Sequence, residues 1–285
     1  MDDARTPAGV PVPGAAQGAD RTPPAAPAPE AEEEHRIAPV EQSREAPEAA
    51  QAAPPRRLVA LLADAHLSGP GGPAGPLVHQ LAALPALGCR HLVVMGDLFQ
   101  AWVGHRHFET ADIAEVVATL RGLRRRGLRV DYVEGNRDFF LAASPYADAF
   151  DQVASEVAFE DGGVRYLAVH GDGLVEDDWQ YRCWRRLSKS ALSHRLAGRI
   201  PARLARLMVD TTERRLSRTN FKHRRRLPEA AIRRYAERRL AEGHDVLLLG
   251  HFHVARAWPV SGGQVRLLEA WFKTRAVEWL PLEEG

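Results

Sequence analysis

Residues that could bind metal ions recur after short apolar runs of this 285-residue chain. Carboxylate, amide and imidazole groups are donors that proteins offer to divalent cations. Seven side chains of these types stand at such positions: Asp64, His66, Asp97, Asn136, His170, His251 and His253. A lone His or Gly-Asp after a strand is usually structural, but seven candidate ligands in five blocks indicate a metal centre.

The elements that must position these ligands are buried strands. Five runs rich in Val and Leu predict them: Leu58–Ala63, Leu92–Met95, Val130–Glu134, Val164–Val169 and Val246–Leu249. Most of the runs lack strict alternation, which suits strands that are covered on both faces. Because ligands in α/β sheets gather beyond the carboxyl ends of strands, we expect the five blocks to face one rim.

Helical and turn signals complete the expected fold class. Ala111–Arg126 repeats apolar residues on one helical face, and Ser261-Gly262-Gly263 is a hairpin signal between two strand-like runs. The pattern predicts an α/β fold with helices outside a mixed sheet.

Spacing within the blocks adds a geometric expectation. Asp64 and His66 are separated by one residue, as are His251 and His253. Residues i and i+2 just beyond a strand are expected to point the same way, so each pair could hold one ion. Glycines beside the ligands would let the backbone turn sharply next to the site.

The charge of the chain is unevenly distributed, although its net value is only +1. Residues 1–55 contain 11 of the 20 Pro, 10 acidic and 4 basic residues, and hence a net charge of −6. This segment has few large apolar residues, and their burial cannot offset the entropy lost on ordering the chain. We therefore expect a disordered tail; an acidic interaction arm is the alternative. Residues 56–285 are expected to form the folded domain.

A strongly basic insert lies within that domain, at about residues 179–239. Residues 182–239 hold 19 Lys+Arg and 4 Asp+Glu, a net charge of +15. Residues 179–200 predict a helix with apolar residues three or four apart, and Pro201 is expected to break or kink it. The composition is that of a membrane-surface helix; a cap helix with a solvated basic face is the alternative. No nucleic-acid-binding signature accompanies the charge, so no nucleic acid partner is expected.

Several classes of protein are disfavoured by what the sequence lacks. No run of 18 apolar residues predicts a membrane-spanning helix, and no secretory signal pattern opens the chain. Two cysteines, Cys89 and Cys183, are too few for a disulfide framework and suggest a reducing compartment.

The order D-x-H, G-D, G-N-x-D, H-G-D, G-H-x-H resembles that of the calcineurin-like metallophosphoesterases over residues 57–280. The resemblance implies a four-layer α-β-β-α sandwich, with the basic insert as a helical cap, and a centre of two divalent ions. It assigns one ion to Asp64, His66, Asp97 and His253. It assigns the other to Asp97, Asn136, His170 and His251, so that Asp97 bridges the two. The mixed donor set suits Mn²⁺, with Fe, Zn or Mg as alternatives.

A narrower resemblance is to the members of this family that act on UDP-2,3-diacylglucosamine. Gly96–Gly104 is similar to their G-D-L-F-E-A-W-I-G block, and Gly135–Phe139 to their G-N-R-D-F. The resemblance implies hydrolysis to UMP and 2,3-diacylglucosamine 1-phosphate in lipid A biosynthesis, at the cytoplasmic face of the inner membrane. We expect a monomer that binds this anionic surface peripherally. The chain departs from the pattern at Gln100, at His105-Arg106 and at Phe252. None of these is a predicted ligand.

The same resemblance suggests further site residues. Catalytic roles fall to Asp97, Asn136, Arg137 and His251. Substrate contacts fall to Asn136, Arg137, Asp178, Tyr181, Ser217, Arg224 and His251.

Arg137 stands where many metallophosphoesterases have a His that could protonate an alkoxide leaving group. Arginine stays protonated and is a poor proton donor, but it can bind phosphate oxygens. Its presence fits a leaving group that needs no proton, such as a phosphate; the alternative is an ordinary surface arginine.

Two other functions remain open at the level of sequence. One is a soluble pyrophosphatase for other nucleotide diphosphates, such as ADP-ribose or CDP-alcohols. The other is a binding protein that keeps the fold without catalysis, against which the complete ligand set argues.

Overall fold

The computed structural model describes residues 58–174, 179–205, 207, 211 and 227–280. The backbone of 179–182 and 184 is described, but not their side chains. The predicted tail, residues 1–55, lies outside the described residues, and so does part of the predicted insert.

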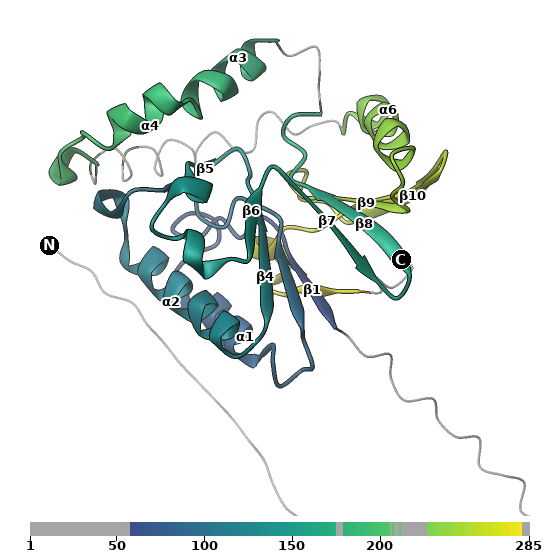
Figure 1. Ribbon diagram of the computed structural model, residues 1–285, viewed down its shortest axis with the longest axis horizontal. Coiled ribbons are helices and arrows are strands. Elements are labelled where there is room, and N and C mark those ends of the chain that lie inside the picture. The colour runs from purple at the N-terminus through teal and green to yellow at the C-terminus, as the bar shows by residue number, and fades with distance from the viewer. Residues whose placement is uncertain (1–57, 175–178, 206, 208–210, 212–226, 281–285) are drawn as a thin grey trace, which may run out of the picture. The chain divides into compact units, whose positions relative to one another are not determined.

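Two five-stranded sheets form the centre of the fold (Figure 1). The first has the order β12-β1-β2-β4-β6, with β1, β2, β4 and β6 parallel and β12 antiparallel to β1. Its strands are β1 Val59–Leu62, β2 His91–Val94, β4 Arg129–Val133, β6 Gln152–Ala154 and β12 Glu278–Trp279.

The second sheet has the order β10-β11-β9-β8-β7. Its central strands β11, β9 and β8 are parallel, while β10 and β7 pair antiparallel at the two edges. Its strands are β7 Glu156–Asp161, β8 Val164–Val169, β9 Val246–Leu249, β10 Arg256–Val260 and β11 Gly263–Leu267. The predicted hairpin at residues 261–263 joins β10 to β11.

Helices cover the outer face of each sheet (Figure 1). The helices α1 (Gly75–Ala83) and α2 (Ala111–Arg125) pack on the first sheet, and α6 (Glu229–Leu240) packs on the second. In α2, Thr110 caps the first turn by accepting from the backbone N–H of Ile113, which satisfies a donor that the helix leaves unpaired.

Side-chain alternation divides the interior into three apolar layers. In β1, Ala60 and Leu62 face the helices, whereas Val59 and Leu61 face the second sheet. The cluster under α6 includes Leu247 and Leu249 of β9, while its Leu248 joins the layer between the sheets. The order helix, sheet, sheet, helix confirms the predicted four-layer sandwich and refines the single mixed sheet expected from hydrophobic runs alone.

Short elements surround the rim of the strands. The strands β3 (Trp102–Val103) and β5 (Asp138–Phe139) form a two-stranded parallel sheet. Helix α7 (Trp271–Thr274) follows β11. Three 3₁₀ turns complete the set: η1 Arg106–Phe108, η2 Leu141–Ala143 and η3 Ala147–Ala149.

The N-terminal part of the insert is helical but is not one helix. It contains α3 (Trp179–Ser188) and α4 (Ala191–Ala197), which we call the cap helices. The predicted uninterrupted helix over 179–200 is wrong, because Ser190 takes an extended backbone and its hydroxyl accepts from Ser193 N–H. Among the described residues, every helix is too short or too polar to span a bilayer.

Candidate metal centre

The carboxyl ends of strands from both sheets lead into the predicted ligands. Asp64, Asp97 and Asn136 follow β1, β2 and β4 of the first sheet, and His170 and His251 follow β8 and β9 of the second. Asp64, Asp97 and His170 are buried, with 0%, 0% and 1% of their surfaces exposed. The two sheets thus contribute to one buried polar cluster.

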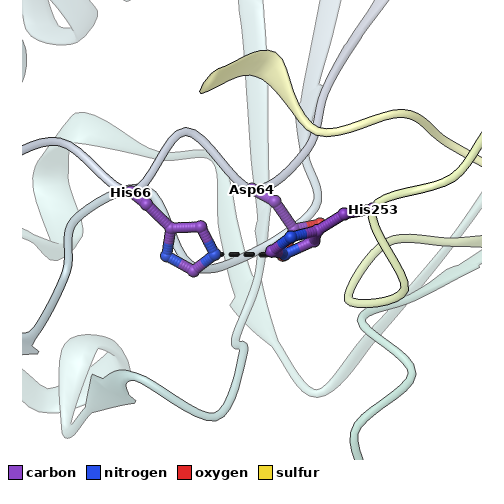
Figure 2. A group of neighbouring side chains, drawn as sticks. All are labelled: Asp64, His66 and His253. Carbon is purple, nitrogen blue, oxygen red and sulfur yellow. Dashed lines mark hydrogen bonds and ion pairs between the residues drawn. The ribbon is translucent and has the colours of Figure 1, made fainter. Parts of the chain in front are cut away.

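Asp64, His66 and His253 form a compact group of side chains (Figure 2). Nε2 of His253 lies 3.0 Å from Oδ1 of Asp64, and Nε2 of His66 lies 3.6 Å from the same oxygen. The two imidazole Nε2 atoms are 3.2 Å apart. Nitrogens this close need a proton or a cation between them, because two lone pairs would repel. The three donor atoms therefore converge as the ligands of one cation do.

A second group consists of Asp64, Asp97 and His170. Nε2 of His170 lies 3.6 Å from Oδ2 of Asp97 and 3.2 Å from Oδ1 of Asn136. Nδ1 of His170 donates to the carbonyl oxygen of Met95 at 2.8 Å, so Nε2 is the ring nitrogen that faces the cluster and would bind a cation once it has lost its own proton.

Asp97 lies between the two groups. Its Oδ2 is 3.6 Å from Nε2 of His170 and 4.0 Å from Nε2 of His66. His251 joins through its backbone N–H, which donates to Oδ2 of Asp64 at 2.7 Å, and its ring packs edge-on against that of His170. All seven predicted ligands therefore meet in one constellation.

The backbone of the ligand residues is left-handed rather than extended. The φ angles of Asp64, His66, Asp97, His251 and His253 are 49°, 45°, 52°, 64° and 55°. Non-glycine residues adopt such angles at a cost of about 1–3 kcal/mol each, and they do so mostly at functional sites. The expectation that i and i+2 converge because the chain is extended is wrong in its reason. Asp64 and His66 converge through a turn of the backbone instead.

Two glycines allow the blocks to approach each other. A Cβ on Gly96 would lie 2.7 Å from the backbone nitrogen of Gly135 and 2.7 Å from Nδ1 of His170. A Cβ on Gly135 would lie 2.3 Å from Oδ1 of Asp97. Any side chain at these positions would force the ligand residues apart.

Burial and neighbouring charges shift the pKa values of the cluster. Burial alone would raise the pKa of Asp64, but the hydrogen bond from His253 and the surrounding imidazoles outweigh it, so the pKa is lowered. The pKa of Asp97 is raised by burial against the attraction of His170. Burial lowers the pKa of His170, but Asp97 and Asp64 outweigh it and raise the value to about 8.

The residues present fit divalent metal ions. Oδ2 of Asp97 is buried and accepts no hydrogen bond from the described residues, although the guanidinium of Arg137 lies near it, and a bound cation would give this oxygen a direct partner. Carboxylate and imidazole donors from both sheets surround it, a donor set that suits first-row divalent metals. The Nδ1–H of His170, fixed by Met95, is the kind of outer contact that orients a ligating imidazole.

Arg137 is part of this cluster and not a surface residue, since only 6% of it is exposed. Its Nε lies 3.4 Å from Oδ2 of Asp97, and its Nη1 donates to the carbonyl oxygen of Gln100 at 3.1 Å. Its backbone N–H donates to Oδ1 of Asp97 at 2.9 Å. The guanidinium is therefore held beside the predicted ligands.

Two supporting residues were not given a role by the sequence. Oδ2 of Asp138 accepts from the backbone N–H groups of Asp97 and Gly135 at 3.0 and 2.7 Å, which joins two ligand blocks. Burial and Asp97 raise the pKa of Asp138 to about 6. The ring of Phe272 packs on His66 and His253, with centroids 5.6 and 5.0 Å away. Asp138 stands in the G-N-x-D motif, which could have revealed it; no local signal marks Phe272.

The predicted substrate contacts of the cap are not brought to the site by the described residues. Asp178, Ser217 and Arg224 lie outside those residues, and Tyr181 is placed on α3 by its backbone only. They remain predictions.

Two relatives of the chain carry the same name. A UDP-2,3-diacylglucosamine hydrolase of Ralstonia nicotianae is 28% identical over 227 residues, which cover 75% of this chain and 83% of the relative. A protein of the same name from Yersinia pestis is 27% identical over 227 residues, which cover 72% and 93%. No family model matches the chain.

Solved structures with similar folds are more distant. A Streptococcus pneumoniae protein described as a predicted phosphoesterase is 14% identical, with a TM-score of 0.33 and coverage of 74% of this chain and 71% of its own. Vacuolar protein sorting 29 of Cryptosporidium parvum is 14% identical, with a TM-score of 0.39 and coverage of 74% and 73%. Likeness at this level carries no weight for function.

The buried ligand constellation and the names of the relatives define the class of the chain: it is a metal-dependent hydrolase. Within that class, the resemblance to UDP-2,3-diacylglucosamine hydrolases is confirmed over most of the chain.

Proposed function

We propose that this chain hydrolyses the diphosphate of UDP-2,3-diacylglucosamine to UMP and 2,3-diacylglucosamine 1-phosphate, a step of lipid A biosynthesis. The observation that carries the proposal is the convergence of Asp64, Asp97 and His170 from separate strands of two sheets. Relatives that share this length of chain are named for the same substrate.

Two divalent ions are proposed as cofactors, with Mn²⁺ as the native metal. One would be held by Asp64, His66, Asp97 and His253. The other would be held by Asp97, Asn136, His170 and His251. Two bound ions supply charge neutralisation at a phosphoryl group and a nucleophile derived from water at neutral pH. The position of Oδ2 of Asp97 between Nε2 of His170 and Nε2 of His66 supports its bridging role.

The chain's own residues would bind and orient the diphosphate. Arg137 has a guanidinium beside Asp97, where it can donate to phosphate oxygens and stabilise charge that develops on them. Asn136 and His251 are half-buried at the edge of the cluster, where a substrate could reach both. An arginine side chain is a poor proton donor, so the leaving group must depart without protonation by Arg137. A phosphate leaving group, with a second pKa near about 6, meets that condition.

The composition of the cap helices supports the proposal of a lipid substrate and of binding to a membrane surface. The large apolar side chains with the greatest exposure in the cap and just beyond it are Leu187, Leu192, Leu196, Leu204 and Leu207. Exposed arginines of the same segment are Arg195, Arg199 and Arg203, which we call the cap arginines; Arg206 lies outside the described residues. Leucines beside cations are the composition of an interfacial helix. We propose that the chain binds peripherally, as a monomer, to the anionic cytoplasmic face of the inner membrane, and that Asp178, Tyr181, Ser217 and Arg224 contact the substrate.

The test is a side-by-side assay of the purified full chain with Mn²⁺. The chain should release UMP from UDP-2,3-diacylglucosamine in mixed micelles. This release should be much faster than the release of UMP from UDP-N-acetylglucosamine or of AMP from ADP-ribose. Equal or faster cleavage of the water-soluble diphosphates would refute the lipid assignment and favour a soluble nucleotide pyrophosphatase. No cleavage of any diphosphate would favour a binding protein.

A further inference from the structure

A cation of the cap reaches the loop that follows His170. Nε of Arg185, on α3, donates to Oδ2 of Asp172 at 2.9 Å. The carboxylate of Asp172 is only 5% exposed, so this ion pair is largely shielded from water, while Arg185 is 32% exposed. A shielded pair fixes geometry better than an exposed one does. The contact therefore holds the chain two residues beyond a predicted ligand.

A second cation reaches the loop that follows β4. Nζ of Lys189, in the turn between α3 and α4, donates to the carbonyl oxygen of Gly135 at 2.8 Å. Gly135 directly precedes Asn136, whose Oδ1 lies 3.2 Å from Nε2 of His170. The packing there is tight, since a Cβ on Gly135 would lie 2.3 Å from Oδ1 of Asp97. Movement of this carbonyl would move the ligands with it.

We propose that Arg185 and Lys189 are positioning residues that couple the cap to the metal ligands Asn136 and His170. The inference rests on the proposed metal centre. Both contacts come from one end of the cap, and each meets the chain within two residues of a ligand assigned to the second ion. Because such coupling is reciprocal, a bound ion at this position also stabilises the docked cap.

The sign of the effect separates positioning from simple charge. Arg185 and Lys189 are cations, so by electrostatic repulsion alone their removal should tighten the binding of a divalent cation nearby. Loss of outer contacts that hold ligands in place weakens metal binding instead, typically by about 10–100-fold. A weaker site after removal of a positive charge has no electrostatic explanation.

The experiment measures Mn²⁺ binding to the metal-free full chain by titration calorimetry, without substrate. The variants are Lys189→Met, Arg185→Met and, as a conservative replacement that keeps a donor, Lys189→Arg. Arg186→Met is the matched control. Arg186 is an exposed cation of the same helix, so this substitution removes the same charge as Arg185→Met does. His107→Ala is a second control, because Nε2 of His107 bonds Ala197 O at the far end of the cap, at 2.9 Å.

We expect Lys189→Met and Arg185→Met to raise the Kd of one of the two ions by about 10-fold or more. Lys189→Arg should recover part of the loss, and both controls should bind as wild type. Thermal unfolding of metal-free Lys189→Met should match wild type, because Lys189 is only part-buried. A lower melting temperature is expected only for Arg185→Met, which removes a partner of the shielded Asp172 carboxylate. Unchanged or tighter Mn²⁺ binding in Lys189→Met and Arg185→Met overturns the proposed coupling but leaves the proposed function untouched. Equal weakening in His107→Ala also overturns it, in favour of general loosening of the cap. A wild-type chain that binds no Mn²⁺ overturns the proposed function as well.

Discussion

Replacing Arg137 by Met is expected to lower kcat/KM for a diphosphate substrate by about 10²–10³. The side chain is 6% exposed, so an effective dielectric constant of about 20 is appropriate. Two unit charges about 4 Å apart then interact by about 4 kcal/mol, close to the cost of about 2.7–4 kcal/mol for removing one donor to a transition state. The local fold should persist, because the bond to Oδ1 of Asp97 comes from the backbone N–H of residue 137.

The identity of the leaving group sharpens this prediction. An alkoxide needs a proton, whereas a phosphate departs largely unassisted. The wild-type chain should therefore cleave the diphosphate much faster than an unactivated alkyl phosphate. Arg137→Lys should restore the charge but not the bidentate fork, so partial recovery is expected.

The assay compares wild type, Arg137→Lys and Arg137→Met on UDP-2,3-diacylglucosamine, an alkyl phosphate and an activated aryl phosphate. Elemental analysis of each protein controls for lost metal, because Nε of Arg137 lies 3.4 Å from Oδ2 of Asp97. Full activity of Arg137→Met, or equal turnover of the alkyl phosphate and the diphosphate by wild type, would refute the reasoning.

Three further predictions concern the metal, the membrane and the thiols. Asp97→Ala should lose bound metal and activity while circular dichroism stays near that of wild type; two retained ions with normal turnover would remove Asp97 from the site. The full chain should sediment with anionic vesicles, and less of it should sediment in high salt or after substitution of the cap arginines by Glu. Vesicle binding that is unaffected by both changes would contradict a surface helix. One thiol of the native chain should react quickly with a thiol reagent at pH 8, since Cys183 is exposed whereas burial raises the pKa of Cys89 to about 11; peptide mapping that finds Cys89 labelled first would contradict this.

The strands that carry ligands could be predicted because each contains a run of buried residues that lie on both faces of its sheet. Every residue of β1, Val59–Leu62, is buried, and in β9 only the first residue, Val246, is partly exposed. The edge strand β7, which pairs with β8, is not among the predicted strands, although its buried Val157 and Phe159 alternate with more exposed residues, a pattern that the sequence does show. The strand β12 has two residues, which is too few for any periodic signal.

The geometry of the site depends on contacts between distant parts of the chain. Left-handed angles at Asp64 and His253 are not a local preference of these residues, and arise where the surrounding fold overrides that preference. The contact of Arg185 with Asp172 crosses from the cap to the rim of the sheet, and the basic composition of the insert did not distinguish Arg185 from its neighbours. Ser190 is a local signal for the break before α4, but the apolar spacing continues through it and predicts a single helix.

The most direct test of the central claim is mass spectrometry of the products formed from UDP-2,3-diacylglucosamine by the full chain. After treatment with a chelator and dialysis, the chain should form neither product, and added Mn²⁺ should restore both UMP and 2,3-diacylglucosamine 1-phosphate in equal amounts. Product formation that persists in the chelated protein, or restored activity that releases UMP only from water-soluble diphosphates, would contradict the account.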